Sequence, residues 1–273
     1  MNYRHAFHAG NLSDCMKHAL LVWLLRALQR KPAGVFALDT HAGAGSYDLS
    51  AGPAERTGEW RDGIARLLDD PPEVLADYVT LVRDCGLYPG SPVLLEALLR
   101  PQDRLACCEL HPDEAAALRA TMRGSGAAVH RRDAWEALGA LLPPPQGLRR
   151  ALVLIDPPYE AEDEYVRLAA GLARGHAQFP TGVFAAWYPV KHRAPVRALH
   201  TALRESGVRD IVAVELNLRE PLDPARLNGS GLLVINPPYR FEQEVPALLE
   251  ALLRRLGTGE AGASVAVERL VDE

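Results

Sequence analysis

Short apolar runs alternate along this chain with longer segments whose apolar residues recur at helical spacing. Runs at 35–39, 104–109, 127–132 and 151–155 predict strands that are buried on both faces of a sheet. Further strands are expected at 182–188, 210–216, 231–236 and 263–267, and helices at 11–29, 112–123, 135–142, 163–175, 195–206 and 246–256. The alternation predicts one α/β domain over 1–273, with a mostly parallel sheet and helices on both faces.

The alternation is interrupted after the turn that follows the first strand. Residues 46–57 are polar and rich in glycine and proline, and two helix-like segments follow at about 58–68 and 72–85. A regular helix start comes only at Ser91, a good N-cap residue, with Pro92 in the first helical position. We therefore expect a small inserted helical subdomain over about 48–88.

The strand at 151–155 runs directly into Asp156-Pro157-Pro158-Tyr159. Asp156 is expected at the carboxyl end of the strand, the edge at which open α/β sheets bind their ligands. The two prolines stiffen the turn because their φ angles are fixed. Asp156 and the carbonyl of Pro157 can accept the two N–H bonds of a nucleobase amino group, while Tyr159 stacks on the base. The alternative is a turn that only ends a strand.

A second copy of this pattern, Asn236-Pro237-Pro238-Tyr239, follows another apolar strand. Both turns cannot hold the same substrate. The second comes three strands later, where sheets of this kind end in a hairpin, so we expect it outside the crevice and assign it a structural role.

Acidic residues end successive strands, at Asp39, Glu109, Asp133 and Asp156. The first three are expected to line one crevice, where Glu109 can take both hydroxyls of a ribose and Asp133 an adenine edge. The glycine turn around Gly43 lets the backbone approach a ligand closely. It lacks the full GxGxxG fingerprint and a Walker lysine, which favours a nucleoside without a phosphate chain, such as S-adenosylmethionine. The alternative is that these acids only solvate loop ends.

The first eighteen residues are dense in polar and aromatic side chains, among them Tyr3, Arg4, His5, His8, Lys17 and His18. Asp14, Lys17 and His18 share one face of the helix expected from Asn11 or Ser13 onward. We expect this segment, 1–18, to fold over the site and hold substrate, although such runs often form a solvated face. A metal site built from the two histidines of the tail is disfavoured, because no nearby carboxylate or cysteine completes a set of ligands.

Basic residues cluster at Arg131-Arg132, at Arg149-Arg150 and at Lys191-His192-Arg193. The last cluster follows Trp187-Tyr188, and basic groups interleaved with aromatic rings predict a platform for phosphates and bases. The first two pairs are equally well explained as ordinary surface charge.

Composition narrows the class of protein. The chain has 273 residues, a net charge of −5 and 48% hydrophobic residues, values typical of a globular protein with a sizeable core. An acidic protein that binds nucleic acid must gather its positive charge in a patch. The four cysteines show no metal or disulfide spacing. No apolar run is long enough to span a membrane, and no export signal is recognised, so a cytoplasmic monomer without a metal is expected.

Further motifs stand in order along the chain: N-Y-R-H-A-F-H-A-G-N-x-x-D-x-x-K-H, D-T-H-A-G-A-G, A-E-R-T-G-E, Y-P-G-S-P, I-D-P-P-Y-E, W-Y-P-V and I-N-P-P. Asp-Pro-Pro-Tyr is typical of methyltransferases that act on adenine N6 or cytosine N4. From Tyr3 to about Pro238 the chain resembles the RlmJ family, whose members methylate N6 of one adenine in 23S ribosomal RNA. The resemblance implies a Rossmann-like, class I methyltransferase that uses S-adenosylmethionine and carries an inserted helical subdomain.

The resemblance also implies roles for individual residues. Asp156 is the implied catalytic position, assisted at the adenine or cofactor side by Tyr3, His5 and Lys17. The implied contacts to S-adenosylmethionine are His18, His41, Ser91, Glu109, Asp133, Ala134 through its backbone, and Asp156.

Three rival functions remain open at this stage. A DNA adenine methyltransferase would share the same turn and differ only in its substrate. An oxidoreductase that binds NAD is disfavoured by the short glycine turn. An RNA-binding module without activity would have no use for an intact Asp156-to-Tyr159 turn.

Overall fold

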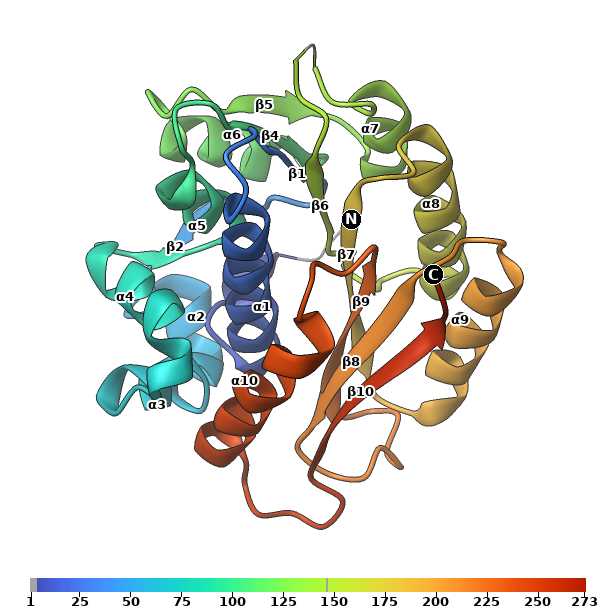
Figure 1. Cartoon of the computed structure of the whole chain (residues 1–273). Helices are drawn as coiled ribbons and strands as arrows, with labels where there is room; N and C mark the ends of the chain where they lie inside the picture. The colour runs from blue at the N-terminus through green and yellow to red at the C-terminus, as the bar shows by residue number, and fades with distance from the viewer. Residues whose placement is uncertain (1–3, 146) are drawn as a thin grey trace.

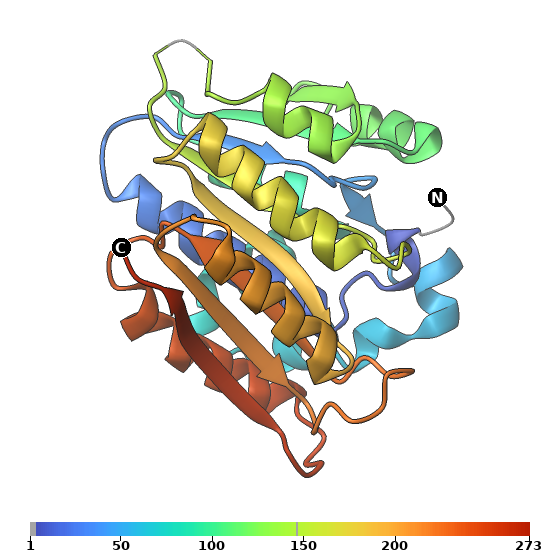
Figure 2. The ribbon, with the colours of Figure 1, turned by 90° about the vertical axis from the view of Figure 1, so that its right-hand side faces the viewer.

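The computed structural model describes residues 4–145 and 147–273 and places a central sheet between two layers of helices (Figures 1 and 2). In this part of the chain, eight strands form the sheet in the order β10-β8-β9-β7-β6-β1-β4-β5. The run from β5 to β7 is parallel, β9 is antiparallel to both β7 and β8, and β10 is antiparallel to β8. The strand bounds are β1 Phe36–Asp39, β4 Arg104–Glu109, β5 Ala128–Arg131, β6 Ala151–Ile155, β7 Val183–Val190, β8 Ile211–Asn217, β9 Gly229–Ile235 and β10 Ser264–Val271. The predicted α/β class and mostly parallel sheet are confirmed.

Helices cover both faces of the sheet, as predicted. One face carries α1 Leu12–Gln29, α5 Ser91–Leu98, α6 Pro112–Thr121 and α10 Phe241–Leu256. The other face carries α7 Ala134–Ala140, α8 Glu164–Gln178 and α9 Arg193–Glu205, which lie in front of the sheet in Figure 2.

The apolar run of β6 shows why the sheet needs both layers. All of its side chains are buried, and they alternate between two cores. Leu152 and Leu154 face the core beneath α1, whereas Val153 and Ile155 face the core beneath α8. Each such side chain contributes about 1.5–3 kcal/mol on burial, which fixes the strand and therefore the turn at its end.

The segment predicted to be an insertion is bounded by a short antiparallel pair, β2 Ser46–Tyr47 and β3 Tyr88–Pro89. Between them lie α2 Gly52–Thr57, α3 Ile64–Asp69 and α4 Ala76–Asp84, and the short 3-10 helices η2 Glu59–Arg61 and η3 Glu73–Leu75. Helix α2 occupies a segment for which the sequence predicts no helix, and it ends at Gly58 in the left-handed conformation. Side chains of α3 and α4 join the same core as α1.

Several predicted helix starts are wrong by part of a turn or more, and two of them involve a proline. Gly90 is the N-cap of α5, so Ser91 is already its first residue. Helix α10 begins at Phe241 and contains Pro246, which the sequence prediction places at the start because proline favours the first turn. Inside the helix, Pro246 instead removes one backbone hydrogen bond.

Candidate active site

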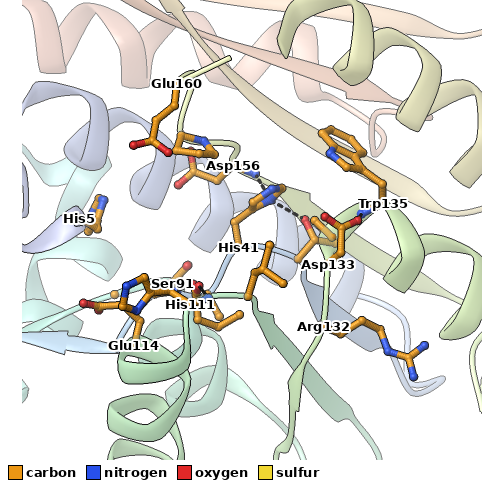
Figure 3. Close-up of a pocket in the computed structure, with 18 of the residues that line it drawn as sticks. His5, His41, Ser91, His111, Glu114, Arg132, Asp133, Trp135, Asp156 and Glu160 are labelled. Atoms are coloured by element: carbon orange, nitrogen blue, oxygen red, sulfur yellow. Dashed lines mark hydrogen bonds between the residues drawn. The ribbon is translucent and has the colours of Figure 1, made fainter. Parts of the chain in front are cut away.

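A cavity of about 260 Å³ opens at the carboxyl edge of the parallel strands (Figure 3). Its walls come from the turns after β1, β4, β5 and β6, from the second turn of α1 and from the start of α5. The sequence-predicted residues that line it are His5, Lys17, His18, His41, Gly43, Ser91, Glu109, Asp133, Ala134 and Asp156. Tyr3 lies outside the described residues. The cavity thus gathers most of the predicted set at one place.

Asp156 is held on two sides at the rim of this cavity. Its backbone N–H donates to Nδ1 of His41 at 3.2 Å, and Figure 3 shows the His41 ring next to it. Its carboxylate oxygen Oδ2 accepts a hydrogen bond from Nζ of Lys17 at 2.5 Å. The side chain remains 14% exposed, so the carboxylate is anchored through one oxygen while its other oxygen keeps acceptor capacity.

Lys17 bridges two carboxylates. Besides Asp156, its Nζ lies 2.9 Å from Oδ1 of Asp14, one turn earlier on α1. Burial alone would lower the pKa of Lys17, but the two carboxylates outweigh burial and raise it. Burial alone would likewise raise the pKa of Asp14, but the charges of His5 and Lys17 hold it well below its usual value. The rim therefore carries a fixed ammonium group next to Asp156.

Two histidines of the cavity are neutral near pH 7. Burial lowers the pKa of His41 to about 4, and its Nδ1 accepts the N–H of Asp156 and also lies 2.9 Å from the hydroxyl oxygen of Thr40. Burial lowers the pKa of His18 to about 3, and its Nδ1 lies 3.1 Å from the hydroxyl of Tyr88. Both rings provide neutral, partly apolar walls.

Glu109 and Asp133 form the opposite side of the cavity. Glu109 accepts the backbone N–H of Gly43 at 2.9 Å and that of His111 at 2.7 Å, one through each oxygen. Burial raises the pKa of Glu109. Asp133 caps α7 by accepting the N–H of Trp135 at 2.9 Å through Oδ1. Each carboxylate is held by backbone donors and still has lone pairs for a ligand.

The turn after β1 leaves no room for a side chain at Gly43. Its φ is +58°, and a Cβ there would lie 2.3 Å from the hydroxyl of Tyr47. The backbone therefore reaches Glu109 directly, as the glycine turn predicts.

Comparison with known proteins connects this geometry to a family. The family model described as "Ribosomal RNA large subunit methyltransferase D, RlmJ" matches residues 32–268. The chain belongs to the RlmJ family. A relative named "Ribosomal RNA large subunit methyltransferase J" from Escherichia coli K12 is 41% identical and covers 97% of this chain and 98% of its own length. A relative of the same name from Haemophilus influenzae is 39% identical, with coverages of 95% and 96%.

A solved structure of similar shape supports the membership. A protein from Legionella pneumophila has a TM-score of 0.86 and 34% identity, with 96% of this chain and 98% of that chain covered. The fold of this RlmJ-family chain is the Rossmann-like fold of class I methyltransferases, a mostly parallel sheet in which β9, between β7 and β8, and the edge strand β10 run antiparallel to the others. Both the suspected family and the fold class are confirmed.

Tyr159 of the RlmJ-family turn lies behind the cavity wall, which is formed here by Pro158. Its φ is +52° and its hydroxyl donates to the carbonyl of Trp187 at 3.0 Å. Its ring contacts those of Tyr165 and Trp187, with centroids 4.8 and 5.6 Å apart. Pro157 is buried. Stacking of Tyr159 on a base therefore stays a prediction.

The second turn lies at the other edge of the sheet. Because β9 is antiparallel to β7, its last residue pairs with Phe184 near the start of β7. The side chain of Asn236 donates to the carbonyls of Pro180 and Gly182 at 2.8 and 2.7 Å. It is outside the crevice, as predicted.

Asp39 does not line the cavity, contrary to the prediction for the strand-end acids. It is fully buried and accepts the backbone N–H of His41 at 3.2 Å, which supports the turn from beneath. Burial raises the pKa of Asp39 to about 7. In the register of the sheet Asp39 pairs with Cys107 and Leu154, two residues short of Glu109 and Asp156, so it lies below the edge that forms the cavity.

The predicted aromatic platform after β7 is not formed by Tyr188. That side chain is buried, and its hydroxyl donates to Glu215 at 3.1 Å and lies 3.2 Å from His200. Lys191 is exposed just beyond β7. Arg150 precedes β6, so it lies at the opposite edge, where it donates to the carbonyl of Leu28.

The structure corrects the reason given above against a metal site at the tail histidines. Carboxylates do lie near the tail histidines, since His5 contacts Asp14 and His8 contacts Glu59. Across residues 4–145 and 147–273, no group of three or more possible metal ligands is found. None of the helices in those ranges is long and apolar enough to cross a membrane.

Several cavity residues were not identified from the sequence. They come from a short strand, loops and helix turns, and include Tyr47, His111, Glu114, Trp135, Glu160 and Arg167. Among these six, only Glu160 belongs to a quoted motif, I-D-P-P-Y-E. Position after a strand end is a usable signal for His111 and Trp135, which follow Glu109 and Asp133 by two residues.

Proposed function

We propose that this protein transfers the methyl group of S-adenosylmethionine to N6 of one adenine in 23S ribosomal RNA, as a monomer in the cytoplasm. The observation that carries the proposal is the Asp156 carboxylate, which is anchored through Oδ2 by Lys17 at the mouth of a cavity whose far side holds Glu109 and Asp133. That arrangement places a hydrogen-bond acceptor for an amino group next to a site that suits a nucleoside.

The cavity residues fit the nucleoside part of S-adenosylmethionine. Glu109 is held by two backbone donors and presents its remaining lone pairs to the cavity, which suits the two ribose hydroxyls. Asp133 and the backbone of Ala134 would contact the adenine edge of the cofactor, and His18, His41 and Ser91 would complete the wall. When bound, S-adenosylmethionine supplies a methyl group on a positively charged sulfur, which attracts a nucleophile.

The Asp156-to-Tyr159 turn would orient the target amine. The lone pair of adenine N6 is delocalised into the ring, so the amine is a poor nucleophile. Accepting its two N–H bonds at Asp156 and at the carbonyl of Pro157 would draw the nitrogen toward tetrahedral geometry and localise that pair. Positioning at about 3 Å then supplies a large share of the rate.

Asp156 also stabilises the charge that develops. N6 becomes positive as the new bond forms, and a fixed carboxylate at its N–H bonds stabilises that charge. Because the amine is far too weak an acid to be deprotonated beforehand, its proton leaves with or after methyl transfer, through the carboxylate of Asp156 to water, and S-adenosylhomocysteine is the second product. Lys17 keeps the carboxylate in place throughout. His5, and Tyr3 from the tail, would assist at the adenine side.

The target base must leave its stack to reach this cavity. An adenine in structured RNA is reached only after it is splayed out, and single-stranded or looped regions make that least costly. Tyr159 would then offer its ring to the flipped base. The insertion, 48–88, would act as a subdomain beside the mouth.

A methyl-transfer assay tests the proposal with matched variants of the two turns. The substrate is unmodified 23S ribosomal RNA transcribed in vitro, with a DNA copy of the same sequence as the second arm. Asp156→Ala should reduce turnover about 10³-fold while cofactor binding falls far less, and Asn236→Ala should stay within a few-fold of the wild type. Turnover retained by Asp156→Ala, or faster reaction with the DNA, would refute the proposed role.

A further inference from the structure

Glu59 lies in η2 of the insertion and contacts the segment that precedes α1. Its carboxylate oxygens lie 3.0 and 3.1 Å from Nδ1 of His8. It also accepts a hydrogen bond from the side-chain amide of Asn11 at 2.9 Å. Glu59 is not among the residues that line the cavity.

The contact with Glu59 determines which way the amide of Asn11 faces. An asparagine side chain has a donor group on one side and an acceptor on the other, and a carboxylate only accepts. Glu59 therefore holds the NH₂ group of Asn11, and its Oδ1 is left pointing at α1. There it accepts the backbone N–H of Asp14 at 3.1 Å and caps the helix.

From this cap, polar contacts continue to the reaction site. Asp14 accepts the backbone N–H of Gly10 at 2.9 Å through Oδ2 and contacts Lys17 at 2.9 Å through Oδ1. Lys17 in turn holds the carboxylate of Asp156. The unbroken series is Glu59, Asn11, Asp14, Lys17, Asp156.

The backbone of the insertion also packs closely against the backbone of the segment that precedes α1. The N–H of Ile64 donates to the carbonyl of Gly10 at 2.8 Å, and a Cβ on Gly63 would lie 2.0 Å from that oxygen. The hydroxyl of Thr57 donates to the carbonyl of Phe7 at 2.6 Å. In Figure 2, the light-blue insertion lies beside the dark-blue N-terminal segment. The insertion thus fixes the position of the segment that leads into α1, the helix that carries Lys17.

We infer that Glu59 is a positioning residue for methyl transfer, which fixes the cap of α1 and so holds Lys17 against Asp156. The inference rests on the proposed function, and it assigns the insertion a task in the reaction besides any contact with RNA.

Single-turnover methylation by the full-length protein tests this with three variants. Glu59→Ala should slow transfer by about 10-fold to 10²-fold, because small misplacement of reacting groups has effects of that size, with cofactor affinity measured by calorimetry unchanged. Glu59→Gln keeps an acceptor for Asn11 and should restore most of the rate. Asp70→Asn, the matched control, breaks the ion pair between the insertion and Arg255 of α10 and should react like the wild type.

Hydrogen exchange gives a second readout that needs no activity. Amides of 11–17 should exchange faster in Glu59→Ala, while those of β6 and α8 stay protected. If the wild type methylates no ribosomal RNA, the proposed function fails. The exchange result still decides whether Glu59 stabilises the start of α1. A wild-type rate for Glu59→Ala, or an equal loss in Asp70→Asn with faster exchange throughout, would overturn the inference.

Discussion

The chain forms an apolar strand followed by Pro-Pro-Tyr twice, and only one copy reaches the cavity. Asp156 follows a parallel strand in the middle of the sheet and contacts Lys17, whereas Asn236 follows an antiparallel strand and bonds two backbone carbonyls. Tyr239 is 83% exposed, while Tyr159 is tied to β7. Strand direction, rather than the motif, decides which turn reaches the cavity.

After Asp156→Ala, the variant that makes the first turn a copy of the second should have the largest effect on turnover. Asp156→Asn leaves one acceptor oxygen where Lys17 and the target amine each need one. We expect turnover to fall about 10²-fold, with the fold intact by circular dichroism. Wild-type turnover would show that the second acceptor is not used.

Removing the ammonium group of Lys17 should show how much the anchoring of the Asp156 carboxylate contributes to stability and to turnover. Lys17→Met keeps the volume but leaves Asp14 and Asp156 without their shared cation, in a site where Lys17 is only 4% exposed. Losing one partner of a buried pair should lower the free energy of unfolding by about 3 kcal/mol and turnover by about 10-fold. Urea unfolding and the methylation assay measure the two effects; an unchanged unfolding midpoint would contradict the buried-pair account.

Lowering the pH should weaken the hydrogen bond that holds the first turn and leave that of the second turn unchanged. Its backbone N–H is held by His41, whose pKa burial lowers to about 4 from 6.5, whereas that of Asn236 is held by the carbonyl of Asp210. Between those pH values the unfolded chain binds the extra proton, so the contribution of His41 to stability falls as pH drops from about 6.5 to about 4.

The variant His41→Asn keeps an acceptor near the position of Nδ1 and does not titrate. Its free energy of unfolding should therefore depend less on pH in that window. Urea unfolding at a series of pH values measures the difference between the two proteins, and parallel curves would exclude His41 as the source.

The converse exchange should have the smallest effect on activity. Asn236→Asp places carboxylate oxygens against the carbonyls of Pro180 and Gly182, which now receive hydrogen bonds. We expect stability to fall by about 2 kcal/mol while turnover per folded molecule stays within a few-fold of the wild type. A total loss in a folded variant would reverse the assignment of the two turns.

The parts predicted from the sequence are those with a local signal. Apolar runs locate the strands, and the position after each run places Glu109, Asp133 and Asp156 at one edge, because parallel strands end together. The second turn could be set aside for the same reason, since a final hairpin reverses the strand.

The remainder depends on contacts between distant segments. Lys17 and Asp156 are 139 residues apart, and Glu59 and Asn11 are 48 apart, so no spacing in the chain reveals either contact. Tyr188 was expected at a platform because aromatic and basic residues alternate there. Its strand is buried on both faces, and the ring turns to Glu215 instead.

The central claim is that the anchored carboxylate of Asp156 grips the amino group of an adenine, and the position of the transferred methyl group tests it most directly. Unmodified 23S ribosomal RNA is treated with the wild-type protein and isotopically labelled S-adenosylmethionine, digested to nucleosides and analysed by mass spectrometry. The account predicts that the label appears in N6-methyladenosine at a single site and disappears with Asp156→Ala. Label on a ribose, on a ring nitrogen or on another base would contradict it.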